Sequence, residues 1–298
     1  MKKLADKINR IGLVANPEKS SCRGLVQSAV ALIKAASRHA LCEAATARLA
    51  GIKGPTSPDV ASLTREVDLL MVFGGDGTML RIAREAAGSQ TPIIGINVGS
   101  LGFLTDVASE QLPLALKQIW AGEAILETRP LIEGLGQAQG RAVSSLALND
   151  FVISRGAAPR LIELEVTVDH EVLTHYRCDG LIVCSPTGST AYSLAAGGSV
   201  VNPSAEVFTL TPICPHTLSN RSVIVSLASV IKVRVLSEKL EVILTADGQT
   251  IFPLATGDII TVRKSRQTIR LLHLAGSSFF DTLRRKLNWN VSPKTGKS

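Results

Sequence analysis

The stretch Val67-Asp-Leu-Leu-Met-Val-Phe-Gly-Gly-Asp-Gly-Thr78 joins a β-rich apolar run to a glycine-rich turn. The run ends at Gly74, and residues 78–87 have the pattern of a helix, with Gly88 as its C-terminal stop. A buried strand that turns sharply into a helix is the repeating unit of an α/β domain. The stretch therefore predicts a parallel sheet that is covered by helices on both faces.

Outside this stretch, the first part of the chain repeats the same alternation. The apolar runs 11–15 and 92–96 are predicted strands, and residues 25–36 and 112–120 carry helical spacing. Near residue 126 the helical signals give way to strand and turn signals. Strands are predicted at 161–168, 223–225, 231–236, 240–245, 259–262 and 268–272.

Two turn signals and a helical tail complete the predicted organisation. Asp247-Gly248 is a strong hairpin signal, and the small residues between Gly134 and Ser145 predict an exposed hairpin. Residues 278–289 are predicted to be a helix that returns to the first domain. We therefore predict an α/β domain at 1–126, a mostly-β domain at 127–276 and a helical tail at 277–298.

Composition narrows the class of protein. Hydrophobic residues make up 45% of the 298 residues and charged residues 19%, which favours a folded chain with a sizeable core. The formal net charge is +7, but the basic residues are scattered and only 4% of residues are aromatic, so we expect anionic phosphates rather than nucleic acid as partners.

The number of cysteines and the lengths of the apolar segments indicate the cellular compartment of the protein. The five cysteines are odd in number and have no Cys-x-x-Cys spacing, so neither a disulfide framework nor a zinc site is predicted. The apolar run Ile11–Ala15 is too short for a signal peptide core, and no run approaches the length of a membrane span. We expect a cytoplasmic protein with no membrane partner.

The turn Gly74-Gly-Asp-Gly-Thr78 is the first candidate for chemistry. Ligands of open α/β sheets bind at the carboxyl ends of strands, where this turn lies. Its glycines allow positive φ and close approach to a ligand, and N–H groups at the start of the helix favour phosphate. Asp76 would add a carboxylate. The turn is neither a Walker loop nor a dinucleotide fingerprint, and a plain strand-to-helix turn capped by Asp76 remains the alternative.

Further polar segments follow predicted strands. An amide and carboxylate pair, or a loop of small hydroxyl residues, can bind ribose hydroxyls and phosphates through side-chain and backbone groups. His216 can contact phosphate but is as readily structural. Each segment alone also fits an ordinary turn. The segments are Asn97-Val-Gly-Ser-Leu-Gly-Phe-Leu-Thr105, Asn149-Asp150, Asp179-Gly180 and Ser185-Pro-Thr-Gly-Ser-Thr-Ala-Tyr-Ser193.

In their order and spacing, these motifs together with Pro215-His-Thr-Leu218 resemble the NAD kinase family, most closely its bacterial members. The resemblance spans roughly residues 10 to 290. It implies an N-terminal Rossmann-like α/β domain and a C-terminal β-sandwich-like domain with the site between them. It also implies transfer of the γ-phosphate of ATP to NAD, a divalent metal such as Mg²⁺, and a homo-oligomer, either dimer or tetramer.

The resemblance also implies roles for individual residues. Asp76 is similar to the general base that acts on the adenosine-ribose 2′-hydroxyl, with Gly77 beside it in binding. An arginine at position 177 is similar to members that prefer NAD over NADH. The remaining positions implied to bind NAD are Asn149, Asp150, Arg160, Asp179, Thr190, Ala191, Tyr192, Ser193, Leu194, Ala195 and Gln249.

Three residues depart from the family pattern. Ser185 stands where threonine is usual, Ala195 stands where serine is usual, and Ser222 stands where proline is usual. Two other classes remain open: a lipid kinase or phosphofructokinase, which share a similar glycine turn, and a dinucleotide-binding module without catalysis. Neither is expected to combine Asp76 with all the downstream loops.

Overall fold

The computed structural model describes residues 8–100, 102–105, 107–216 and 221–289. Leu101 of the predicted loop, Thr217 and Leu218 of the histidine motif and the end of the tail at 290–298 lie outside the described residues. By their contacts the residues form two compact units. Among the described residues, the first unit comprises those within 8–82, 89–127 and 270–289, and the second comprises those within 83–88 and 128–269.

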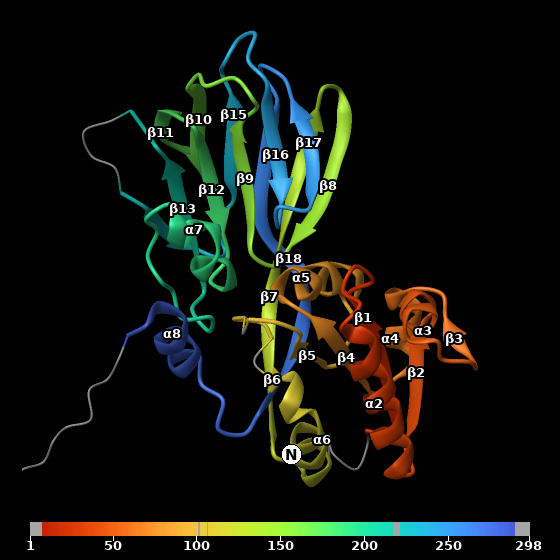
Figure 1. Ribbon diagram of the computed structural model, residues 1–298. Coiled ribbons are helices and arrows are strands. Elements are labelled where there is room, and N and C mark those ends of the chain that lie inside the picture. Colours follow the sequence, from red (N-terminus) through yellow and green to blue (C-terminus); the bar gives the residue numbers. More distant parts are fainter. Residues whose placement is uncertain (1–7, 101, 106, 217–220, 290–298) are drawn as a thin grey trace, which may run out of the picture. The chain divides into compact units, whose positions relative to one another are not determined.

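The first unit is built on a parallel sheet with strand order β5-β4-β1-β2-β3 (Figure 1). Of these strands, β1, β4 and β5 follow the apolar runs, which confirms the predicted strands at 11–15, 67–73 and 92–96. Short β6 and one residue of β18 (Leu271) also pair in parallel with β5. The strands are β1 Arg10–Ala15, β2 His39–Glu43, β3 Thr56–Ser57, β4 Leu69–Gly74, β5 Ile93–Asn97 and β6 Val107–Ala108.

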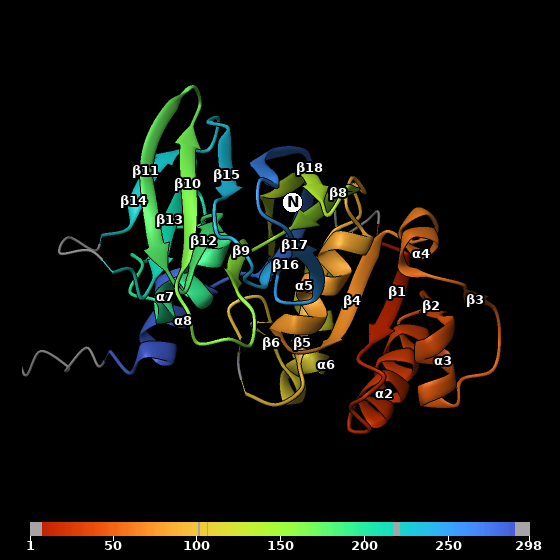
Figure 2. The same cartoon turned by 90° about the horizontal axis from the view of Figure 1, so that it is seen from above.

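Helices cover both faces of this sheet, as the sequence predicts. Alternate residues of β1 face opposite sides, so Ile11 and Leu13 join a core with α2, α3 and α6. A Cβ on Gly12 would lie 3.1 Å from Leu63 of α4, which places α4 on the other face. Figure 2 shows α2 and α3 beside β1 and β2. The helices are α2 Cys22–Ala35, α3 Ala44–Ala50, α4 Val60–Glu66, α5 Asp76–Glu85, α6 Leu112–Ala121 and α8 Phe279–Leu287, with the 3₁₀ turn η1 Ser109–Gln111.

The second unit is a sandwich of two antiparallel sheets, which confirms the predicted mostly-β half (Figure 1). One sheet contains β11-β10-β15-β18 with β7 and β8, and the other has the order β14-β13-β12-β9-β16-β17. Residues from both sheets share one buried core, including Leu164, Val233, Phe151 and Leu181. The strands are β7 Ala124–Ala138, β8 Arg141–Ala147, β9 Asp150–Arg155, β10 Ile162–Val168, β11 Glu171–Cys178, β12 Gly180–Cys184, β13 Val207–Ile213, β14 Val223–Ser226, β15 Ile231–Val235, β16 Val242–Ala246, β17 Thr250–Leu254 and β18 Ile259–Leu274.

The structure tests the predictions of a hairpin, a turn and two late strands. The 134–145 hairpin is confirmed by the pairing of β7 with β8. Asp247 and Gly248 form the β16–β17 turn, with φ values of 51° and 63°. The prediction of separate strands at 259–262 and 268–272 is wrong, because β18 is continuous and its polar middle hides the alternation.

The tail is helical over Phe279–Leu287, with Ser278 as its N-cap. The ring centroids of Phe279 and Phe103 are 6.5 Å apart within the first unit. The predicted boundaries at 126 and 276 remain proposals. Among the described residues, no helix combines the length and apolar character needed to cross a membrane.

Candidate functional site

Asp76 is the first residue of α5, and Gly75 alone separates it from the carboxyl end of β4. Its half-buried carboxylate accepts three hydrogen bonds from the loop that follows β5. Phe103 N donates to Oδ2 at 2.8 Å, Leu104 N donates to Oδ1 at 3.0 Å and Thr105 Oγ1 donates to Oδ1 at 3.2 Å. The glycine turn and the 97–105 loop therefore meet at Asp76, as their positions after neighbouring parallel strands predict.

Asn97 supports the same loop from the end of β5. Its buried side-chain amide donates to Ser100 O and to Thr105 Oγ1, both at 2.8 Å. A Cβ on Gly102 would overlap Oδ1 of Asp76, so a glycine is needed for the loop to approach the carboxylate. The loop is therefore shaped around the side chain of Asp76.

The expected use of positive φ in the glycine turn is wrong. None of Gly74, Gly75 and Gly77 has a positive φ. Gly74 is required for packing instead, because a Cβ there would overlap Oγ1 of Thr78, the residue that begins the predicted helix. The turn is thus specified by close contact between the end of β4 and the first turn of α5.

In the second unit, Asn149 and Asp150 lie at the start of β9, where Asp247 binds their backbone. Oδ1 of Asp247 accepts from Asn149 N at 2.8 Å and from Asp150 N at 3.3 Å, and Oδ2 accepts from Leu148 N at 3.1 Å. Asp247 N in turn donates to Asp150 O at 3.0 Å. The β16–β17 turn therefore fixes the backbone that presents the amide and carboxyl pair.

Arg84 lies near the end of α5, in the part of that helix that belongs to the second unit, and bonds the same turn. Its Nη1 donates to Asp247 Oδ2 at 2.9 Å, and its Nη2 donates to Gln249 Oε1 at 2.5 Å. The Asp247 side chain is fully buried and the Arg84 side chain is 16% exposed. Arg84 thus joins Gln249 to Asp247, whose carboxylate binds the backbone of Asn149 and Asp150. Arg84 and the capping role of Asp247 were missed, because neither has a local sequence signal beyond the turn.

The loop Ser185–Tyr192 packs directly on Asn149. Ser185 N donates to Asn149 O at 2.8 Å, and Ser185 Oγ donates to Leu148 O at 2.5 Å. A Cβ on Gly188 would overlap the carbonyl of Asn149, which explains the glycine there. The serine that departs from the family pattern at 185 therefore retains a hydroxyl with a structural role.

The loop continues into the 3₁₀ turn η2 (Thr187–Thr190) and the short helix α7 (Tyr192–Ala195). The side chain of Ser193 is buried and lies 2.9 Å from Thr211 Oγ1. Tyr192 is 48% exposed, which excludes a core role for its ring. Thr190, Ala191 and Leu194 are partly buried, and Ala195 is exposed.

The remaining predicted positions lie on neighbouring strands of the second unit. Asp179 Oδ1 accepts from Arg155 Nε at 2.7 Å, between β11 and β12. Arg177 is exposed at the end of β11, 4.0 Å from Glu163, and its carbonyl accepts from His216 N. Arg160 is exposed in the loop before β10. No hydrogen bond between these residues and the Asn149–Asp150 pair is found among the described residues.

Asp150 is an unusual carboxyl group because it is 96% buried beside a second carboxylate. Burial, together with the smaller effect of the like charge of Asp247, raises the pKa of Asp150 to about 7. The folded protein therefore holds a proton on Asp150 at pH values where the unfolded chain has lost it. Below pH 7 this side chain is a hydrogen-bond donor as well as an acceptor.

A pH dependence of stability follows from this shift. Because the folded pKa of Asp150 is raised above the unfolded value of about 4, its stabilisation is present at low pH and is lost as pH rises toward 7. Between pH 5 and pH 8 we expect the wild-type free energy of unfolding to fall by about 2–3 kcal/mol relative to Asp150→Asn. Urea unfolding of both proteins measures the difference, and parallel pH profiles would contradict it.

The described residues contain no group of three or more His, Cys, Asp or Glu side chains that could hold a metal ion. Mg²⁺ commonly binds through one or two carboxylates, water and substrate phosphates rather than through a protein cage. An ion held in that way by a bound triphosphate would not need such a group.

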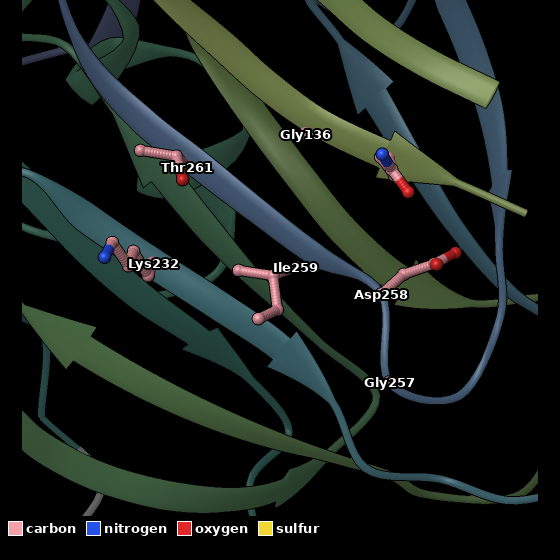
Figure 3. A pocket seen from close by; sticks show the side chains of 7 residues that line it. Gly136, Lys232, Gly257, Asp258, Ile259 and Thr261 are labelled. Atoms are coloured by element: carbon pink, nitrogen blue, oxygen red, sulfur yellow. The ribbon is translucent and has the colours of Figure 1, made fainter. Parts of the chain in front are cut away.

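A separate hollow lies on the sandwich of the second unit (Figure 3). It has a volume of about 520 Å³ and is lined by Lys232, Asp258, Thr261 and residues of β7. None of the sequence-predicted site residues lines it. Asp258 is engaged in the fold, since its Oδ2 accepts from Gln139 N and Ala255 N. The hollow is therefore distinct from the motif residues.

The two halves of the chain match two domain models of one protein family. Residues 11–124 match the family model of the ATP-NAD kinase N-terminal domain, and residues 148–274 match that of the ATP-NAD kinase C-terminal domain. The NAD kinase of Moorella thermoacetica is 42% identical over 280 residues, which cover 94% of this chain and 89% of the relative.

Two solved structures are similar to the structure of this chain. Yeast NADH kinase complexed with NADH has a TM-score of 0.84 and 26% identity, with 97% of this chain and 90% of that chain covered. An NAD kinase from Archaeoglobus fulgidus in complex with ATP has a TM-score of 0.75 and 28% identity, with 94% of this chain and 98% of that chain covered.

Proposed function

Because the chain belongs to the NAD kinase family, we propose that Asp76 is the general base in the transfer of the γ-phosphoryl group of ATP to the adenosine-ribose 2′-hydroxyl of NAD. Phosphorylation of NAD with ATP as the donor is the activity of this family and of this chain. The choice of base and of acceptor atom is the part that we propose.

The observation that carries the proposal is the way the Asp76 carboxylate is held. An ionised carboxylate offers about four lone-pair positions, and three are used by Phe103, Leu104 and Thr105. Among the described residues no further donor binds this carboxylate, so one position is left to accept the proton of a hydroxyl group. The same three bonds fix the orientation of the carboxylate, which a base must keep within hydrogen-bond reach of its substrate.

Phosphoryl transfer depends mainly on positioning and on stabilisation of charge. In the proposed reaction the 2′-hydroxyl attacks the γ-phosphorus, its proton passes to Asp76 and ADP leaves. When bound to the triphosphate, Mg²⁺ offsets the developing negative charge. The protein supplies the oriented carboxylate and the backbone of the glycine turn at the carboxyl end of β4.

We assign NAD binding to the second unit and to Gly77 of the first. The segment 149–150 offers an amide and a carboxyl group on a fixed backbone. Arg84 joins Gln249 to Asp247, and Asp247 binds the backbone of this segment. In α7 the exposed Tyr192 offers an aromatic ring. The exposed arginines at 160 and 177 offer positive charge. Asp179 belongs to the same set by its position in the family pattern.

The family resemblance and the free cysteines support three further parts of the proposal. All five cysteines are free, and four of them are buried, as expected for a chain in a reducing compartment. We include a cytoplasmic location, Mg²⁺ as the divalent ion and a homo-oligomeric state. Sedimentation of the purified protein tests the homo-oligomeric state. Activity measured with and without EDTA tests the need for a divalent ion.

An assay of the purified protein with ATP, Mg²⁺ and NAD tests the function against the other classes. NADP is detected through a dehydrogenase that accepts only NADP, and diacylglycerol and fructose 6-phosphate are offered in parallel reactions. The proposal expects NADP alone to form. Phosphorylation of the lipid or sugar in its place, or binding of NAD without turnover, would assign the chain to one of the alternatives.

Tyr192→Ala is expected to raise the KM for NAD by about 10-fold, because the exposed ring would no longer stack on a base. Tyr192→Phe keeps the ring and should retain a KM close to that of the wild type. Steady-state kinetics at saturating ATP measure both. A KM for Tyr192→Ala equal to the wild-type value would remove Tyr192 from the NAD site.

A further inference from the structure

Lys19 lies in the turn that follows β1 and reaches the loop after β5. Its half-buried side chain places Nζ 2.8 Å from Val98 O, to which it donates a hydrogen bond. The turn itself is closed by backbone bonds from Lys19 N to Asn16 O and from Cys22 N to Lys19 O. The ammonium group is therefore held at a defined place beside the carboxyl ends of the parallel strands.

Two glycines face this ammonium group from different loops. A Cβ on Gly75 would lie 3.9 Å from Lys19 Nζ, and a Cβ on Gly99 would lie 3.8 Å from it. Within 4 Å neither Cβ would meet another described atom beyond its chain neighbours. Gly99 also has a φ of +129°, which side chains rarely adopt. The glycine turn and the 97–105 loop thus leave open space in front of one positive charge.

No described carboxylate neutralises the charge of Lys19. In the part of the chain that the structure describes, no carboxylate forms an ion pair with Lys19, and Val98 O is its hydrogen-bond acceptor. An ammonium group has three N–H donors, so two remain for another acceptor. Asp76, next to Gly75 in the chain, directs its carboxylate to residues 103–105.

We propose that Lys19 binds the β- and γ-phosphate oxygens of the nucleotide donor. The proposal rests on the proposed kinase function and adds a residue to the donor site. A lysine ammonium is a compact charge suited to phosphate, and the missing side chains at Gly75 and Gly99 let phosphate oxygens approach it. The bond to Val98 O holds the ammonium between the two loops before the donor binds.

Lys19→Met tests this role, since it keeps the length of the side chain and removes its charge. We expect its Kd for ATP to rise by about 10- to 100-fold, the usual effect of losing a charged hydrogen bond. Its Kd for AMP, which lacks the β- and γ-phosphates, should stay within twofold. Lys19→Arg should recover part of the ATP affinity. Lys53→Met, which removes an exposed lysine of the same unit, serves as the control.

Calorimetric titrations with ATP and with AMP, together with the thermal midpoint, separate binding from a structural role. Unchanged ATP affinity in Lys19→Met would overturn the proposal. Equal weakening of ATP and AMP with a lowered midpoint would also overturn it, because Lys19 would then only join the two loops. These titrations need no turnover, so a Lys19-dependent ATP affinity in a protein that forms no NADP would reject the proposed function alone.

Discussion

Asp76→Asn is expected to lower kcat for NADP formation by about 100- to 10,000-fold, the range associated with a general base. An amide does not accept a proton near neutral pH, so the hydroxyl of the ribose would attack without assistance. NAD binding should survive, because the proposed contacts to the dinucleotide lie mostly elsewhere. The coupled assay gives kcat, and calorimetry gives the Kd for NAD.

The same substitution has a structural cost that must be separated from the catalytic one. An asparagine amide would place N–H donors against Phe103 N or Leu104 N, which costs about 1–3 kcal/mol of stability. Thr105→Val is the control, because it removes one bond to Asp76 and one from Asn97 but keeps the carboxylate. We expect Thr105→Val to lose stability and retain most turnover. Near-normal turnover in Asp76→Asn would show that Asp76 is not the base.

Asp247→Asn is expected to lower the free energy of unfolding by about 3–5 kcal/mol, since it breaks a buried ion pair with Arg84. The carboxylate also accepts from three consecutive backbone N–H groups, and an amide offers only one oxygen to them. Affinity for NAD should fall as well, because the backbone at Asn149 and Asp150 would lose its support. Urea unfolding and NAD titration measure the two effects.

Asp169→Asn is a matched control for this prediction. Asp169 also has a positive φ, 56° against 51° for Asp247, and asparagine tolerates that conformation equally in both turns. Its carboxylate accepts one exposed hydrogen bond, from Val230 N at 2.9 Å, which an amide oxygen can also accept. We expect less than about 1 kcal/mol of destabilisation. Equal losses in the two variants would show that the Asp247 network contributes little.

The fold was largely predictable because its main strands carry strong local signals. The apolar runs of β1, β4 and β5 are buried along their length, so composition alone marks them. The short helices α3 and α4 were missed, since seven residues hold too few turns for a clear period. The prediction divided β18 into two strands because exposed polar residues lie in the middle of this strand.

The candidate site was predictable only where its residues form local motifs. The glycine turn, the Asn149-Asp150 pair and the hydroxyl-rich loop are each contiguous, so their residue types could be recognised. The contacts of Arg84 with Asp247 and of Lys19 with Val98 join residues 163 and 79 positions apart. Periodicity and motif spacing carry no information on such pairs, which arise from the packing of strands and loops in three dimensions.

The fate of the γ-phosphoryl group tests the central claim most directly. Purified protein is incubated with Mg²⁺, ATP labelled in the γ-phosphate, and either NAD or its analogue lacking the adenosine-ribose 2′-hydroxyl. We expect the label to enter a product that an NADP-specific dehydrogenase reduces, and the 2′-deoxy analogue to receive no label. Label transferred to the analogue, or absent from NADP with NAD as the acceptor, would contradict the central claim.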